Sequence, residues 1–89
     1  MDEMFLIAAY RSRQAVMRLD GALRRAGIKT DIVSTPRAVA VGCGLSVRFE
    51  ESDLGRVRKL VQAENTSTFL GIYRVQRLGG RILVSPVAG

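Results

Sequence analysis

The apolar residues of this chain follow two different spacings, one typical of strands and one typical of helices. Residues 5–10 form a short run that is apolar at every position and has charged residues on both sides. A run that is apolar on both of its faces predicts a buried central strand. The next apolar residues recur every three or four positions, which predicts a helix that begins after Ser12 as its N-cap and ends at Gly27.

Two further strands are predicted in the middle of the chain. Residues 28–34 form the first of them, and Pro36 ends it because proline has no N–H for a ladder hydrogen bond. Residues 45–49 alternate between apolar and polar, which predicts a half-buried strand with Ser46 and Arg48 on the face opposite the core.

The last third of the chain predicts one more helix and a hairpin. Ser52 is the expected N-cap of the helix, whose apolar stripe falls at positions 54, 57, 60 and 61. Residues 69–75 then predict a strand. Gly79 and Gly80 are typical of a tight turn, and residues 81–85 predict a fifth strand that pairs with the fourth.

This order of elements predicts an α+β fold of the ferredoxin-like type. In that βαββαβ sandwich an antiparallel sheet carries two helices on one face, and an extra C-terminal strand would extend the sheet here. The other face would be open. We expect Leu6 and Ala8 to point to that open face, where apolar residues would favour a partner or a dimer.

Chain length and charge bear on the number of domains, the cellular compartment and the class of partner. Its 89 residues predict a single domain, residues 1–89. Asp2 and Glu3 stand where a signal peptide would carry positive charge, and the apolar run after them is too short to span a bilayer, so we expect a cytoplasmic protein without a membrane partner. The net charge of +6 is spread along the chain, which favours a solvated surface over a nucleic-acid interface.

One cysteine and no histidine limit the available chemistry. A lone cysteine cannot form an intrachain disulfide, which fits a reducing compartment. The absence of histidine excludes His-containing zinc sites, Cys-His dyads and Ser-His-Asp triads. We therefore expect no metal and no cofactor.

Cys43 is the residue best suited to chemistry, because it lies between two glycines in the loop before the alternating strand. Its thiolate is the reactive form, and backbone amides of a glycine-flanked turn or a nearby arginine would stabilise that anion. The alternative is that the cysteine is a small buried apolar residue. The candidate site comprises Cys43 as the reactive residue and, as the environment of its thiolate, Thr35, Pro36, Arg37, Gly42, Gly44 and Arg48.

The same loop carries a family resemblance. Thr35-Pro36-Arg37, a short spacer and Cys43-Gly44-Leu45-Ser46-Val47-Arg48-Phe49 resemble the signature of a family of small bacterial selenium/sulfur carrier protein-like domains. The likeness covers about residues 4–75, whereas residues 76–89 form an added turn and edge strand. It implies that Cys43 holds the chalcogen as a persulfide or selenide adduct and passes it from a donor protein to an acceptor protein, without turnover of its own.

Two other functions remain open from the residues. A nucleic-acid-binding module would use Arg48 and Arg74 on the open sheet face, although the chain lacks the aromatic-rich strand motif of RNA-recognition domains. A regulatory or assembly domain would form a homodimer through the open sheet face or the C-terminal edge strand, with Cys43 merely packed.

Overall fold

Five strands and two helices make up the described part of the chain, which in this computed structural model is residues 3–39, 44–64 and 67–87. They are β1 (Glu3–Tyr10), α1 (Arg13–Arg25), β2 (Asp31–Ser34), β3 (Leu45–Phe49), the 3-10 turn η1 (Glu51–Asp53), α2 (Leu54–Glu64), β4 (Phe69–Leu78) and β5 (Arg81–Pro86). Neither of these helices is long and apolar enough to cross a membrane.

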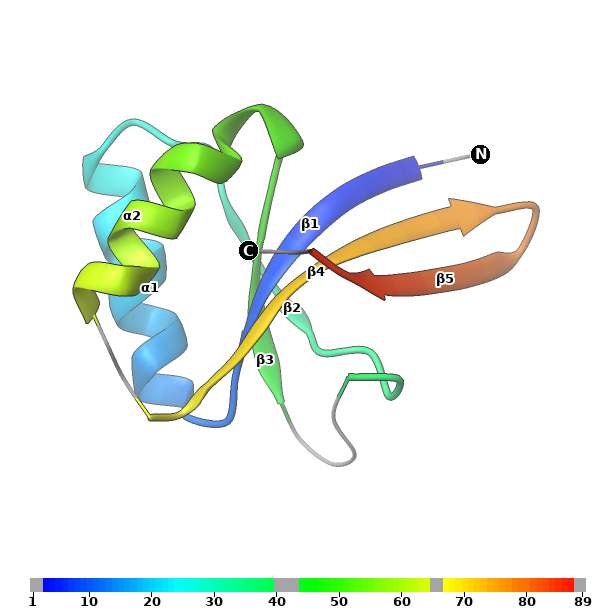
Figure 1. Cartoon of the computed structure of the whole chain (residues 1–89), viewed down its shortest axis with the longest axis horizontal. Helices are drawn as coiled ribbons and strands as arrows, with labels where there is room; N and C mark the ends of the chain where they lie inside the picture. Colours follow the sequence, from blue (N-terminus) through cyan, green and yellow to red (C-terminus); the bar gives the residue numbers. More distant parts are fainter. Residues whose placement is uncertain (1–2, 40–43, 65–66, 88–89) are drawn as a thin grey trace.

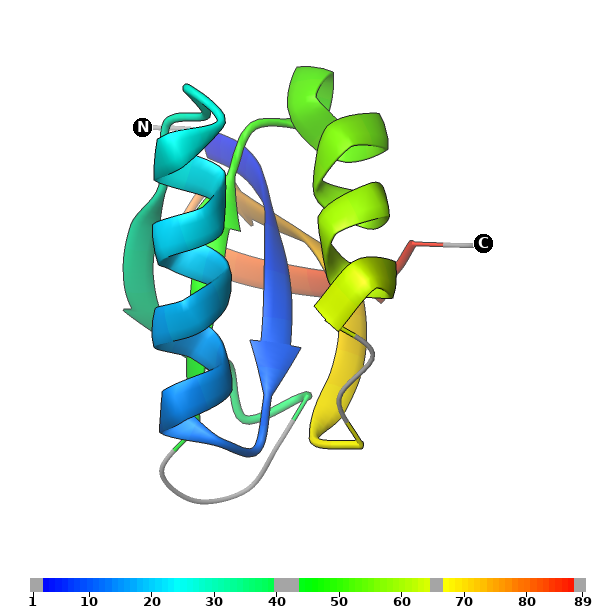
Figure 2. The same ribbon diagram turned by 90° about the vertical axis from the view of Figure 1, so that its left-hand side faces the viewer.

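The strands form one antiparallel sheet with the order β2-β3-β1-β4-β5. β1 is the central strand, as its two apolar faces predict. Both helices cover the same face of the sheet (Figures 1 and 2). The predictions of an α+β fold, an antiparallel sheet with two helices on one face and an extra C-terminal strand are confirmed.

Helix α1 begins and ends where its capping residues predict. The Ser12 side chain accepts a hydrogen bond of 3.2 Å from the amide three residues later. Gly27 has a φ of 79°, and the amide of Ile28 donates to the carbonyl of Leu23 at 2.9 Å. Ile28 is thus a buried residue of the helix end, and β2 begins only at Asp31, so the predicted start at residue 28 is wrong.

Helix α2 begins later than its sequence pattern predicts. Ser52 lies inside η1, and the regular helix begins at Leu54. An N-cap residue needs an extended backbone, which Glu50 has and which a residue within the turn cannot have. The prediction that Ser52 caps this helix is therefore wrong, whereas the apolar stripe is confirmed by the burial of Val57 and Val61.

The hairpin of β4 and β5 is longer than predicted. β4 continues to Leu78, which pairs with Arg81 across a two-residue turn. Gly79 and Gly80 have φ values of 54° and 83°, which the right-handed twist of a two-residue hairpin requires. In Figure 1 the tip of this hairpin extends away from the two helices.

Side chains of β1 alternate between the two faces of the sheet, and the predicted assignment of these faces is wrong. Leu6 and Ala8 belong to the core beneath the helices. Phe5 and Ile7 lie on the helix-free face, in a second cluster with Val75. All three are buried, so this face is itself closed over by neighbouring side chains and the hairpin.

Candidate functional site

A pair of contacts closes the base of the loop that joins β2 to β3. The amide of Thr35 donates to the carbonyl of Gly44 at 3.0 Å. The hydroxyls of Thr35 and Ser46 are 2.6 Å apart, and both residues are buried. We call these two contacts the loop clamp. They fix the points at which the loop leaves and rejoins the sheet; Gly42 and Cys43, within this loop, lie outside the described residues.

Gly44 permits the close approach that the loop clamp requires. A Cβ atom at this position would lie 3.1 Å from the Thr35 hydroxyl oxygen and 3.2 Å from its Cβ. These distances are shorter than ordinary van der Waals contacts, and Thr35 is held by Ser46 and cannot retreat without losing a buried hydrogen bond. The absence of a side chain directly after Cys43 therefore has a steric cause.

A turn positions the arginine at the start of the loop. The amide of Val39 donates to the carbonyl of Pro36 at 2.9 Å, and Arg37 is exposed within this turn. The structure thus brings Thr35, Pro36, Arg37 and Gly44 together at one end of the sheet, among the residues that the sequence predicts for the site.

Arg48, also predicted for the site, is held by residues of β1. Its guanidinium is 2.7 Å from the Glu3 carboxylate and 3.9 Å from the centre of the Phe5 ring. The hydrogen bond from Arg48 lowers the pKa of Glu3 below its ordinary value. Gly44 and Arg48 are four residues apart on an extended strand, a separation of roughly 13 Å. The structure therefore pairs Arg48 with Glu3, on the sheet face where Arg48 lines a hollow together with Thr35 and Pro36.

Two arginines that the sequence analysis missed lie beside the loop clamp. Arg11 and Arg13 line a hollow together with Gly44 and Leu45. Neither arginine side chain forms an ion pair with a described residue. Strand pairing explains why these arginines lie near the loop. Antiparallel pairing sets Tyr10 opposite Leu45 and so brings the end of β1 next to the start of β3.

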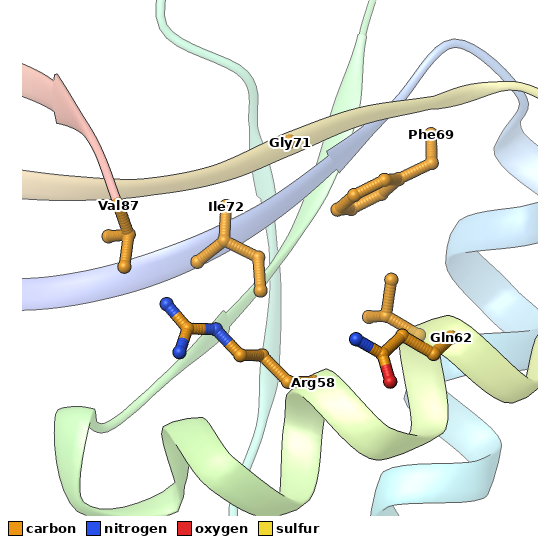
Figure 3. A pocket seen from close by; sticks show the side chains of 7 residues that line it. Arg58, Gln62, Phe69, Gly71, Ile72 and Val87 are labelled. Atoms are coloured by element: carbon orange, nitrogen blue, oxygen red, sulfur yellow. The ribbon is translucent and has the colours of Figure 1, made fainter. Parts of the chain in front are cut away.

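A separate pocket lies between α2 and β4 and contains none of the predicted site residues (Figure 3). Arg58 and Gln62 reach into it from the helix, opposite Phe69 and Ile72 of β4 and Val87, which follows β5. β4 is separated from β3 by the central strand, so this pocket and the loop clamp are distinct places. Among the described residues, no three His, Cys, Asp or Glu side chains gather as metal ligands.

Comparison with known protein families identifies a match over most of the chain. The model of the family described as "Putative Se/S carrier protein-like" matches residues 5–74. This range includes both sides of the loop clamp and ends within β4, so the outer part of the hairpin lies beyond it. No curated protein and no solved structure matches the chain.

Proposed function

Because the chain belongs to the Se/S carrier protein-like family, we propose that it carries sulfur or selenium on Cys43 for transfer from a donor protein to an acceptor protein. The observation that carries this proposal is the loop clamp. The loop that contains the chain's single cysteine is closed at its base by this clamp. Gly44, at the base, lies beside Arg11 and Arg13.

The transfer requires no cofactor and no net oxidation. The Cys43 thiolate attacks the outer sulfur of a donor persulfide, and the donor's S–S bond breaks with its electron pair on the departing donor thiolate. Cys43 then holds the outer sulfur, together with its proton, as a new persulfide. An acceptor nucleophile attacks that outer sulfur in turn and releases the Cys43 thiolate. When the outer atom is selenium, the same bonds form and break, and Cys43 then holds a selenide adduct.

The arginines at this end of the sheet supply positive charge for an anion that the chain has no histidine to stabilise. Arg11 and Arg13 line the hollow at Gly44, and Arg37 lies in the turn that starts the loop. A fixed cation near a thiolate favours the charged form over the thiol. We assign these three residues to the stabilisation of the Cys43 thiolate and of the persulfide anion.

Two finer assignments accompany this proposal. We interpret strands β2-β3-β1-β4 with the two helices as a ferredoxin-like sandwich to which β5 is added.

A carrier thiol must stay free of unwanted disulfides, which a reducing compartment ensures. We therefore place the work of this protein in the cytoplasm.

The test is adduct formation on the intact chain. After incubation with glutathione persulfide, the mass of the protein should increase by one chalcogen atom, and dithiothreitol should reverse the increase. Cys43→Ala should keep its fold by circular dichroism and gain no mass. A mass increase of the same size on Cys43→Ala would contradict the proposal, as would labelling of Cys43 only after the chain unfolds.

The arginines are tested through the rate of Cys43 alkylation. Replacing both Arg11 and Arg13 with glutamine should slow alkylation at neutral pH and shift its pH profile upward. Replacing both Arg18 and Arg25 with glutamine is the matched control, because it removes the same two charges from exposed positions of α1 outside the hollow. Equal effects of the two changes would show that only net charge matters.

A further inference from the structure

The helix-free face of the sheet holds a groove, and we propose that it binds an extended acidic segment of the protein that exchanges chalcogen with this chain. The inference rests on the proposed function, because it names the partner surface of the same loop. Its evidence is the shape of the groove, its continuity with the loop clamp and its charge.

The groove has an apolar floor and two unlike walls. Phe5, Ile7 and Val75 form the floor and are at most 7 % exposed. Residues 33–36 form the wall beside the loop, and Ile82 of β5, 58 % exposed, stands on the other side. A large aliphatic side chain that projects into solvent next to an apolar floor is typical of a surface that contacts another molecule.

The size of the groove favours side chains of a polypeptide over a small molecule. Its volume is about 230 Å³, below the roughly 300–1,000 Å³ of small-molecule sites. It runs along a sheet face between an edge strand and a hairpin. Extended peptides commonly add to the exposed edge of a sheet and place alternate side chains in pockets, and β2, which lines this groove, is an edge strand.

The groove reaches the loop that carries the cysteine. Thr35 and Pro36 line it, and the amide of Thr35 bonds to the carbonyl of Gly44. A partner segment that lies in the groove therefore contacts Thr35, one of the two residues that close the base of the loop with Cys43. Transfer of a chalcogen requires the donor or acceptor sulfur to meet Cys43 directly, and a bound segment of the same partner would hold it there.

The charge of the groove selects an acidic partner. Arg48 and Arg77 line it, and the groove-lining residues include no carboxylate. Outside the groove, the Glu3 carboxylate forms ion pairs with both guanidiniums, at 2.7 Å and 3.5 Å, and Asp31 lies opposite Arg48 on β2. Arg37 adds a further cation beside Pro36. A partner segment with carboxylates at alternate positions would meet this rim with complementary charge.

The net charge of the whole chain argues against a second copy of this chain as the occupant of the groove. Each chain carries a net charge of +6, so two copies repel one another before contact. An acidic partner gains from the same field, which accelerates its encounter.

Part of the groove lies outside the residues that the family model matches. The match to the family model ends at residue 74, and Val75, Arg77 and Ile82 all lie after it. The floor from β1 and the wall at residues 33–36 lie inside that range. We infer that the added hairpin selects the partner, whereas the loop performs the transfer.

The experiment uses the full-length chain with Cys43→Ser, so that binding is measured without any chalcogen. The probe is a fluorescein-labelled six-residue peptide of alternating glutamate and valine, and the comparison peptide alternates lysine and valine. Fluorescence anisotropy gives the affinities at low and at physiological salt, and amide chemical shifts identify the residues that respond. We expect saturable binding of the acidic peptide, weakened by salt, with shifts at residues 5–7, 33–36 and 75–82.

Variants on the two faces of one strand supply matched controls. Ile82→Glu should weaken binding by about tenfold, because it removes an apolar wall and repels the probe. Leu83→Glu introduces the same side chain at the next position of β5, on the opposite face, and should leave binding unchanged. Arg77→Gln should weaken binding severalfold, whereas Arg81→Gln, at an exposed position on the other face, should not.

Three results would overturn the proposal. They are absence of saturable binding, equal binding of the lysine peptide, and equal losses from Ile82→Glu and Leu83→Glu. A concentration-dependent dimer in sedimentation that Ile82→Glu abolishes would instead identify a second copy as the occupant. Because the probe binds without chalcogen, failure here leaves adduct formation on Cys43 standing, and failure of the adduct leaves the groove standing.

Discussion

The helix-covered and helix-free faces of the sheet differ in what closes them, although the same strands supply both. Beneath α1 and α2, Leu6 and Val47 are fully buried by two regular helices. On the other face Ile7 is equally buried, but its neighbours are Arg48, the loop clamp and the hairpin. One face is closed by rigid elements and the other by side chains and a hairpin.

This difference teaches that burial alone does not distinguish a structural face from a functional one. A helix packed on a sheet excludes water over a large area and leaves little room for a partner. A face closed by a hairpin and by an arginine side chain buries individual residues yet retains a groove with a projecting Ile82. Both the loop clamp and the basic groove lie on this second face.

The largest expected effect comes from truncating adjacent residues of β1 that point to opposite faces. Leu6→Ala should lower the free energy of unfolding by about 3–4 kcal/mol, because the helices cannot collapse into the cavity. Ile7→Ala should cost less, about 2 kcal/mol, since the hairpin and side chains above it can relax. Urea denaturation measures both, and Leu83→Ala, 48 % exposed, is the near-neutral control. An equal or larger loss at Ile7 would mean that the hairpin closes its face as rigidly as the helices close theirs.

Removal of one hydroxyl from each face should have effects of opposite sign. Ser46→Ala should cost about 1–2 kcal/mol, because it leaves the buried Thr35 hydroxyl without its partner. On the helix-covered face, the Tyr10 hydroxyl is buried without a hydrogen-bond partner among the described residues. Burial, with a smaller effect of Glu64, raises the pKa of Tyr10 to about 12. Tyr10→Phe should therefore stabilise the fold by about 1 kcal/mol.

Thermal melts of Ser46→Ala and Tyr10→Phe check this prediction. In a domain of this size, 1 kcal/mol shifts the Tm by roughly 4–8 °C. A lower Tm for Tyr10→Phe would mean that its hydroxyl has a partner in solution.

The smallest expected effect is a pH dependence from Glu3 at the rim of the groove. The hydrogen bond from Arg48, and then the charges of Arg48 and Arg77, lower the pKa of Glu3 below 4.5. The unfolded chain thus takes up the proton first as pH falls. The stabilisation is complete above the unfolded pKa and is lost as pH falls through the folded value. Glu3→Gln should remove this part of the acid sensitivity.

The Glu3 effect should be small, because the Glu3 side chain is partly exposed, at 36 %, and high salt should reduce the effect further. Denaturation midpoints compared between about pH 6 and pH 3 measure it. Glu50→Gln is the control, since Glu50 has no ion pair with a described residue. Identical acid profiles for Glu3→Gln and the unsubstituted chain would contradict the prediction.

Local patterns predicted the elements of this fold well. The two-sided apolar run identified β1 as the central strand, and the pair Gly79-Gly80 located the hairpin turn. The errors lie where a neighbouring element decides the outcome. Ile28 reads as the start of a strand but is buried as part of the helix end, and Ser52 reads as an N-cap but lies inside a 3-10 turn.

The surroundings of the candidate site were harder to predict, because long-range pairing sets them. Alternation shows that Leu6 and Ile7 point in opposite directions, but not which of the two faces the helices cover. Arg48 is close to Cys43 in sequence and yet bonds to Glu3, forty-five positions away. Arg11 and Arg13 are distant in sequence and reach the loop because β1 and β3 are antiparallel. The state of Cys43 itself stays a prediction.

The loop clamp also has an evolutionary consequence. The hydrogen bond between Thr35 and Gly44 fixes both ends of the loop on the sheet. The geometry of the sheet therefore does not depend on how many residues lie between them. Doubling the length of a flexible loop adds only about 0.6 kcal/mol of closure entropy. The segment between the clamp residues can therefore accept insertions and new side chains at little cost to the fold. In this respect it resembles the hypervariable loops of binding scaffolds, where a conserved frame leaves the recognition segment free to change.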